Sequence, residues 1–309
     1  MELLGKIGKT VQKHYDKSHR VLSFGEYLQA LEQNPHLHLR NAAQYVRDMF
    51  DCMGAGEVGH PRGKIRRFKL FDAEFDEGEN QLVGQEVVQN KIYRIINNFV
   101  RQGRVDRFIL LHGPNGSSKS TITEMVSRGM KWYSARPEGA AYRFNWIFPT
   151  QKLSRGGIGF GSTEEDGDPL GSYAHLDEEQ IDARLPCEMS DHPILLVPRE
   201  ERAQLLDDML EAGEGEFILS SDIIKGDLCP KCKQVYEALL TSYEGDYLKV
   251  LRHVQVERFY VSRRYRQAST RVEPQLAVDA NASQITADRS INALPTALQS
   301  TTLFELGGD

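Results

Sequence analysis

The sequence predicts an α/β fold, in which strands and helices alternate along the chain. Three observations support this class. An apolar run at 108–111 is followed by a glycine-bearing turn and then a helical pattern, which is the order strand, turn, helix. An aromatic-rich run at 142–148 has the composition of a second strand. The alternation at 254–261 predicts a third strand.

The turn after the first run has the layout of a phosphate-binding P-loop. Glycines let several backbone N–H groups point at one anion, and the helix that follows adds its positive N-terminal end. Lys119 is expected to neutralise the β- and γ-phosphates, and the Ser120 hydroxyl to hold Mg²⁺. ATP and Mg²⁺ are therefore the predicted cofactors. The candidate nucleotide-binding residues are Gly113, Pro114, Asn115, Gly116, Ser117, Ser118, Lys119, Ser120 and Thr121.

One position departs from the P-loop pattern. The pattern G-x-x-x-x-G-K-[ST] has glycine immediately before the lysine, and Ser118 stands there. A side chain at that place crowds the backbone where it approaches phosphate, although Gly113 and Gly116 preserve much of the loop's freedom. The alternative interpretation is an ordinary strand-to-helix turn that is rich in Gly and Ser.

Residues 1–60 are predicted to form a small helical domain. Ser23 and Glu26 have the spacing of a capping box, and Asn34 before Pro35 ends that helix. A second helix is expected to begin at Asn41 and to end at the glycines after residue 53.

Residues 61–309 are predicted to form one ATP-binding domain with an insertion around 151–245. A strongly periodic helix is expected after residue 86, and the helix behind the P-loop has one apolar face that we expect to pack on a sheet. The glycine-rich segment 154–162 is predicted to be a loop, in which Phe160 is a weak candidate for contact with a polypeptide.

Composition excludes several classes of protein. The chain has 309 residues, of which 40% are hydrophobic and 27% charged, as is ordinary for a globular protein. No apolar run approaches the roughly 20 residues that cross a bilayer, and the first residues have no signal-peptide core. We therefore expect a cytoplasmic protein without membrane contact. The net charge of −6 argues against nucleic-acid binding.

Cys229 and Cys232 form the single C-x-x-C pair among the four cysteines. A structural zinc site needs four ligands, so Cys187 and either His175 or His192 would complete it. The pair is alternatively redox-active, since a helix start and neighbouring lysines lower a thiol pKa. A third interpretation is two half-buried thiols with no special chemistry.

Six segments of the chain carry a resemblance to a known family: 82–86, 113–120, 181–188, 228–232, 253–259 and 285–290. Together they resemble the amino-terminal AAA module of the bacterial PrkA serine protein kinases, and serine before the P-loop lysine is typical of that family. The resemblance implies an AAA-type P-loop NTPase sandwich that binds ATP, acts on a protein substrate and assembles as a homo-oligomer, with a ring as one form. It also implies adenine contacts at Val83 and Gly84.

We therefore interpret the chain as the ATP-binding AAA module of a PrkA-like serine protein kinase. No aliphatic run after the P-loop ends in Asp-Glu, and the nearest segments, 194–200 and 217–222, place the acid away from the strand end. The domain is accordingly expected to be incomplete at its C-terminus, and no catalytic residue is predicted. Two alternatives stay open, an ATP-driven protein remodeller or protease component and a non-hydrolysing nucleotide sensor or scaffold.

Arginines gather near the end of the third predicted strand. In an AAA ring, one subunit's arginine stabilises charge on a neighbour's γ-phosphate, and the candidates for this role are Arg258, Arg263 and Arg264. The alternative is that these arginines pair with acids of the same chain, such as Glu257 and Glu273.

Overall fold

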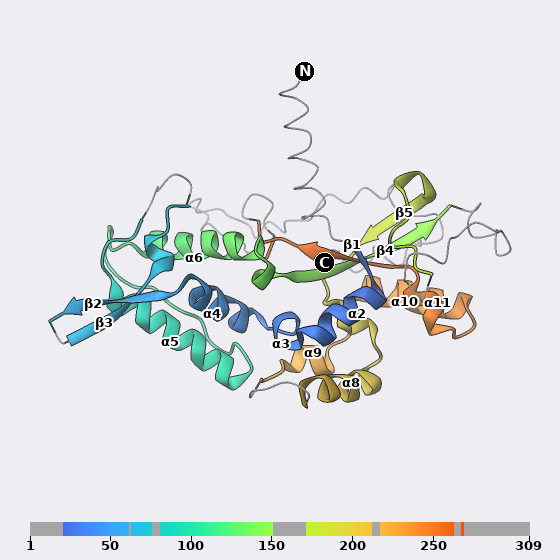
Figure 1. Ribbon diagram of the computed structural model, residues 1–309, viewed down its shortest axis with the longest axis horizontal. Helices are drawn as coiled ribbons and strands as arrows, with labels where there is room; N and C mark the ends of the chain where they lie inside the picture. The colour runs from blue at the N-terminus through green and yellow to red at the C-terminus, as the bar shows by residue number, and fades with distance from the viewer. Residues whose placement is uncertain are drawn as a thin grey trace, which may run out of the picture.

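The computed structural model describes residues 21–61, 63–75, 81–150, 171–211, 217–262 and 267–268. A four-stranded sheet lies at one end of the molecule, and a helical group with a β-hairpin lies at the opposite end (Figure 1). Both groups contain residues from the first 60 positions. The domain boundary at residue 60 stays a prediction.

The sheet has the order β1-β6-β4-β5, and every neighbouring pair is antiparallel. Its strands are β1 (Val21–Ser23), β4 (Ala141–Pro149), β5 (Ile181–Pro186) and β6 (Val254–Phe259). Strands β4 and β6 were expected from their composition, and both are confirmed. The described chain is thus mixed α/β with a small antiparallel sheet, and the AAA-type sandwich stays a prediction.

The larger apolar cluster lies between this sheet and the helices around it. Phe144 and Trp146, two residues apart on β4, both face the cluster and are almost fully buried. The helices that contribute to it are α2 (Phe24–Gln33), α8 (Arg199–Glu211), α9 (Ser221–Lys225), α10 (Pro230–Ser242) and α11 (Tyr247–Leu251), with the 3₁₀ turn η5 (Pro193–Leu196). Leu39, which follows the short helix α3 (Pro35–His38), also belongs to it.

Helix α2 begins and ends where its sequence predicts. Ser23 and Glu26 form the reciprocal capping box, and Asn34 is the C-cap. The same is true of α4 (Ala42–Met53), which Asn41 caps and which Gly54 ends with a φ of 82°. Side-chain caps act within three residues, so these boundaries follow from local sequence alone.

The second cluster holds the helical group together. It lies between α4, α5 (Glu86–Gln102), α6 (Lys119–Ser134) and η1 (Lys69–Asp72), beside the hairpin of β2 (Ala55–His60) and β3 (Gly63–Phe68). The expectation that α6 packs on a sheet is wrong, because its buried residues Ile122 and Met125 belong to this helical cluster. Two short turns, η3 (Pro137–Gly139) and η4 (Glu178–Gln180), complete the described elements.

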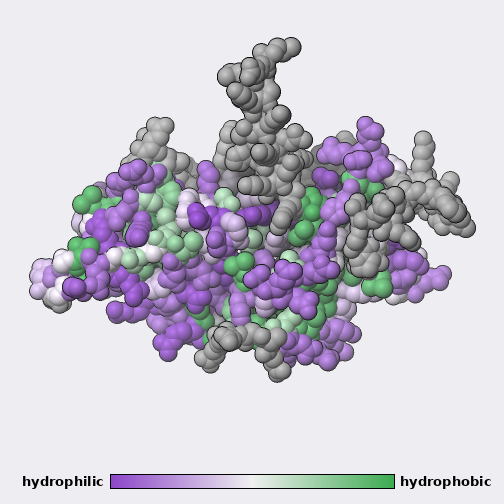
Figure 2. Space-filling model, viewed as in Figure 1, coloured by the Kyte–Doolittle hydropathy of each residue, from purple (hydrophilic) through white to green (hydrophobic). Residues whose placement is uncertain are grey.

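The surface is largely hydrophilic on the face shown in Figure 2, with apolar side chains in small patches. Among the described residues, no helix is both long and apolar enough to cross a membrane.

The strand expected at 108–111 does not form. Phe108 and Leu110 have exposed fractions of 101% and 86%, so neither packs against a layer of the fold. A strand needs a neighbour that accepts and donates its backbone hydrogen bonds. Within the described chain the sheet ends at β1 and β5, and neither pairs with this segment.

Candidate functional site: the loop before helix α6

The P-loop segment forms a turn that leads directly into α6. Two of its residues have left-handed backbone, Gly116 with a φ of 78° and Ser118 with a φ of 60°. The hydroxyl of Ser117 donates to the carbonyl oxygen of Pro114 at 2.8 Å, which closes the turn. The left-handed φ of Ser118 is the conformation for which glycine is favoured, so the departure from the P-loop pattern carries a backbone cost.

The Lys119 side chain lies within this turn. Its Nζ atom donates to the carbonyl oxygens of Gly113 at 2.8 Å and Pro114 at 2.6 Å, and to the Ser117 hydroxyl at 3.1 Å. The loop thus curls around an ammonium group supplied by the first residue of the helix. This arrangement combines a fixed positive charge with an exposed loop.

The first turn of α6 adds to this positive region. Helix α6 begins at Lys119, and its N-cap, Ser118, makes no side-chain hydrogen bond to the first turn. The early N–H groups of a helix have no intrahelical acceptor and carry the positive end of the helix dipole. Ser120 and Thr121 belong to this turn, and Ser120 is exposed.

An apolar cavity of about 640 Å³ lies beside the loop, between α4, α5 and α6. Its lining includes both Lys119 and Ser120, together with Ala43, Val46, Ile92, Ile96, Ile122 and Val126. This volume is within the range of small-molecule sites in proteins. The sequence did not predict this cavity, because its lining comes from three helices and from Val105, Ile109 and Leu111 before the loop, which only the tertiary structure brings together.

Val83 and Gly84 lie before α5 and do not line this cavity. Val83 has an exposed fraction of 87%, and the carbonyl oxygen of Gly84 accepts a hydrogen bond from Gln89 Nε2 at 3.0 Å. Their proposed contact with adenine stays a prediction.

Of the three candidate finger arginines, the structure describes only Arg258; Arg263 and Arg264 lie outside the described residues, as does Phe160. The Arg258 guanidinium donates to the carbonyl oxygens of Ser134, at 3.0 Å, and Arg136. It therefore binds the C-terminal end of α6 within its own chain. A role toward a neighbouring subunit stays a prediction.

Acid pairing within the chain also differs from the expected one. Glu257 pairs with Arg143 across the sheet, at 2.6 Å, and not with Arg258. A Walker B motif is an aliphatic strand that ends in the acid next to the nucleotide, and the nearest segments in this chain, 194–200 and 217–222, are not strands. Residues 194–196 belong to η5, and Asp222 lies in the first turn of α9. No acid of the described chain is thus assigned to catalysis.

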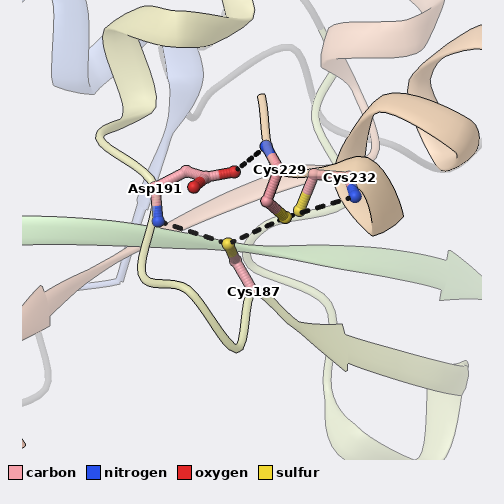
Figure 3. A group of neighbouring side chains, drawn as sticks. All are labelled: Cys187, Asp191, Cys229 and Cys232. Carbon is pink, nitrogen blue, oxygen red and sulfur yellow. Dashed lines mark hydrogen bonds between the residues drawn. The ribbon is translucent and has the colours of Figure 1, made fainter. Parts of the chain in front are cut away.

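The three predicted zinc ligands meet at a second place, at the end of β5. Cys187, Cys229 and Cys232 lie together with Asp191, and one ligand atom from each of the four lies within 4.8 Å of the others (Figure 3). The Sγ atoms of Cys187 and Cys229 are 3.9 Å apart.

Neither predicted histidine joins this group. His192 Nε2 bonds to the carbonyl oxygen of His38 at 2.8 Å, and His175 pairs with Glu26 at 2.8 Å. The sequence analysis missed Asp191, although its position four residues after Cys187 is a spacing that a single turn brings together.

The thiol pKa values diverge within the group. Hydrogen bonding from Cys232, together with the backbone N–H of Asp191, lowers the pKa of Cys187 to about 7, against the opposing effect of burial. Burial raises the pKa of Cys229 to about 11. The pKa of Cys232 is also raised, first by its hydrogen bond to Cys187 and then by burial.

Comparison with known proteins gives one distant relative. The chain is 26% identical over 142 residues to the ATP-dependent protease PrkA of Bacillus subtilis strain 168. The match covers 43% of this chain and only 20% of that protein. No protein-family model matches the chain. No solved structure matches it. The chain is thus distantly similar to PrkA.

Proposed function

We propose that the chain is the ATP-binding AAA module of a PrkA-like protein, and that the 113–120 loop binds the phosphates of Mg-ATP. The observation that carries the proposal is the position of the Lys119 ammonium inside the loop, 2.8 Å from the Gly113 carbonyl oxygen. Among the described residues, this ammonium meets two neutral carbonyls and a hydroxyl, and no carboxylate neutralises it. Phosphate oxygens supply that negative charge.

The residues around Lys119 suit the same ligand. A Cβ atom at Gly116 would meet nothing within 4 Å, so the loop is open at that point. The first-turn N–H groups of α6 are anion donors, and the exposed Ser120 hydroxyl is the group that would hold Mg²⁺. Bound Mg²⁺ would neutralise phosphate charge and orient the γ-phosphate. The cavity beside Lys119 offers apolar surface to a nucleoside base.

Three functions are compatible with such a site: an ATP-driven motor or protease component, a protein kinase, and a nucleotide sensor or scaffold. The relative in Bacillus subtilis is named an ATP-dependent protease, which favours the ATP-driven remodeller or protease component. Resemblance of the P-loop and other segments to the PrkA serine kinases favours phosphoryl transfer to a protein. The absence of an assigned Walker B acid favours a nucleotide sensor or scaffold. An assay with γ-labelled ATP separates them: label appears on serine, appears as free phosphate, or stays on ATP.

Binding is tested by titrating the purified chain with Mg-ATP in a calorimeter. Lys119→Ala is expected to weaken binding at least 100-fold while the far-UV circular dichroism spectrum stays unchanged. Lys131→Ala is the matched control, because Lys131 is an exposed lysine in the last turn of the same helix. Equal affinity of wild type and Lys119→Ala for Mg-ATP refutes the proposal.

Assembly into a homo-oligomer is part of the same proposal. Light scattering with and without Mg-ATP is expected to show a nucleotide-dependent rise in mass. A monomer under both conditions argues against a ring and leaves the binding claim to the calorimeter.

A further inference from the structure

We propose that Cys187, Asp191, Cys229 and Cys232 bind one Zn²⁺ as a closed structural site. The donor set is three sulfurs and a carboxylate, and one ligand atom from each of the four lies within 4.8 Å of the others. In a tetrahedral site with Zn–S bonds near 2.3 Å, two sulfurs stand about 3.8 Å apart. The Cys187 and Cys229 Sγ atoms are 3.9 Å apart, which matches that geometry.

Two rigid elements hold the ligands. Cys187 follows β5 directly, and the turn after it returns Asp191 to the same place (Figure 3). Cys229 is the N-cap of α10, and Cys232 lies in the first turn of that helix. The Cys187 and Cys232 side chains are almost completely buried. The ligand positions are thus fixed before any ion binds.

Backbone N–H groups already point at the sulfurs. The N–H of Asp191 donates to Cys187 Sγ at 3.2 Å, and the N–H of Cys232 donates to Cys229 Sγ at 3.5 Å. Such donors stabilise the thiolate form, which is the form that binds zinc.

Asp191 is placed as the fourth ligand. One of its oxygens, Oδ2, accepts from the N–H of Cys229 at 2.7 Å, which fixes the carboxylate and leaves its other oxygen for the metal. The neighbouring His192 has both ring nitrogens engaged, with the His38 carbonyl oxygen and the Ile194 N–H. A carboxylate therefore takes the place that the sequence analysis gave to histidine.

A disulfide explains less of this arrangement. A bond between Cys187 and Cys229 needs a sulfur separation near 2.05 Å, and it leaves Cys232 as a buried odd thiol. A zinc ion uses all four groups. It ties the end of β5 to the start of α10, two elements separated by about forty residues of sequence.

The test is metal analysis of the full chain purified from zinc-supplemented cells without chelator. We expect one zinc per chain, and less than a fifth of that in Cys229→Ser and Cys232→Ser. Cys52→Ser is the matched control, because Cys52 is the exposed cysteine of α4, and it should retain the full zinc content. Asp191→Asn is expected to lower zinc affinity at least tenfold.

A second measurement keeps the test decisive where a serine variant fails to fold. Wild-type protein is stripped with a chelator and titrated with Co²⁺, which should produce thiolate-to-cobalt charge transfer and the visible bands of tetrahedral cobalt. Three outcomes overturn the proposal. They are wild-type protein without zinc and without the cobalt bands, a mass two units low that marks a disulfide, and full zinc content in both cysteine variants.

Discussion

The Nζ atom of Lys119 lies 2.6 Å from the carbonyl oxygen of Pro114, five residues earlier in the chain. The 113–120 loop thus closes on its own lysine, and its shape depends on the left-handed residues between Pro114 and Lys119. Of these, Ser118 is the one with a side chain.

The conformation of Ser118 leads to the first prediction. Ser118→Gly should keep nucleotide affinity within twofold, because glycine adopts this φ without strain. Ser118→Val should weaken nucleotide binding at least tenfold, since a β-branched residue at positive φ costs roughly 1–3 kcal/mol in the loop. Calorimetric titration with Mg-ATP measures both effects.

Glu244 provides the control for this prediction. It lies between α10 and α11, with a φ of 54°. Glu244→Val should lower the unfolding midpoint without changing nucleotide affinity. Equal loss of affinity in both valine variants would show that the effect is general destabilisation.

The second prediction concerns Arg40, which lies between α3 and α4 in the sequence and donates hydrogen bonds to residues of both helices. Its side chain is only 3% exposed, and its guanidinium donates to Asp48, to the Tyr133 hydroxyl and to the carbonyl oxygens of Leu37 and Glu138. Arg40→Lys keeps the charge but cannot reach all four acceptors. We expect a loss of roughly 2–3 kcal/mol in unfolding free energy, measured by urea denaturation.

Arg47 offers a matched comparison, because it pairs with the same Asp48 while its side chain is 30% exposed. Arg47→Lys should cost less than about 0.5 kcal/mol, as exposed ion pairs do. Similar losses in the two variants would contradict the assignment of a buried, multiply bonded role to Arg40.

The third prediction concerns Gly139, at the end of η3. A Cβ atom there would overlap the carbonyl oxygen of Tyr133, which is backbone and cannot rotate away. The Gly139 carbonyl oxygen also accepts from the Tyr45 hydroxyl at 2.9 Å. Gly139→Ala should therefore lower the unfolding free energy by roughly 2–3 kcal/mol, as overpacking does.

Gly59 of strand β2 is the control for this substitution. A Cβ atom there meets nothing within 4 Å, so Gly59→Ala should change the unfolding free energy by less than about 0.5 kcal/mol. Thermal unfolding of both variants measures the two effects on stability. An unchanged midpoint for Gly139→Ala would show that the Tyr133 backbone moves to accommodate the added Cβ atom.

The fourth prediction is a pH dependence at His253. Burial lowers the pKa of this imidazole, so the neutral ring donates from Nδ1 to the Ile147 carbonyl oxygen and accepts from the Tyr243 hydroxyl, each at 2.7 Å. The unfolded chain then binds a proton at a higher pH than the folded protein. Stability is fully present above the ordinary histidine pKa of about 6.5 and is lost as pH falls toward the lowered value.

His253→Asn removes this proton-binding difference while keeping a donor toward Ile147. The variant should be less stable than wild type at pH 7.5. Between pH 7.5 and 5.5 its unfolding free energy should fall less steeply than that of wild type, with a difference between the two slopes of up to roughly 1.4 kcal/mol per pH unit. His38, whose pKa burial lowers to about 4, acts in the same direction, so part of the slope remains. Parallel pH profiles of wild type and variant would show that His253 does not contribute.

Local sequence predicted the helices well, because their ends are set within a few residues. Ser23 forms the capping box that its spacing from Glu26 indicates, α4 begins after Asn41 as expected, and α10 begins at the proline after Cys229. The apolar positions of α5 and α6 are buried as periodicity predicts. Periodicity does not say what covers an apolar face, and α6 packs against helices where a sheet was expected.

By itself, the sequence determined the boundaries of α2 and α4 and two strands of the sheet, and it predicted the 113–120 loop as a phosphate site. Tertiary structure decided which strands pair, leaving 108–111 outside the described sheet, and brought Asp191 beside cysteines 38 and 41 residues further on. The physical reason is the range of the interactions. A cap or a helical face depends on residues within a turn or two, whereas a strand partner or a metal ligand depends on distant chain that only the complete fold brings close.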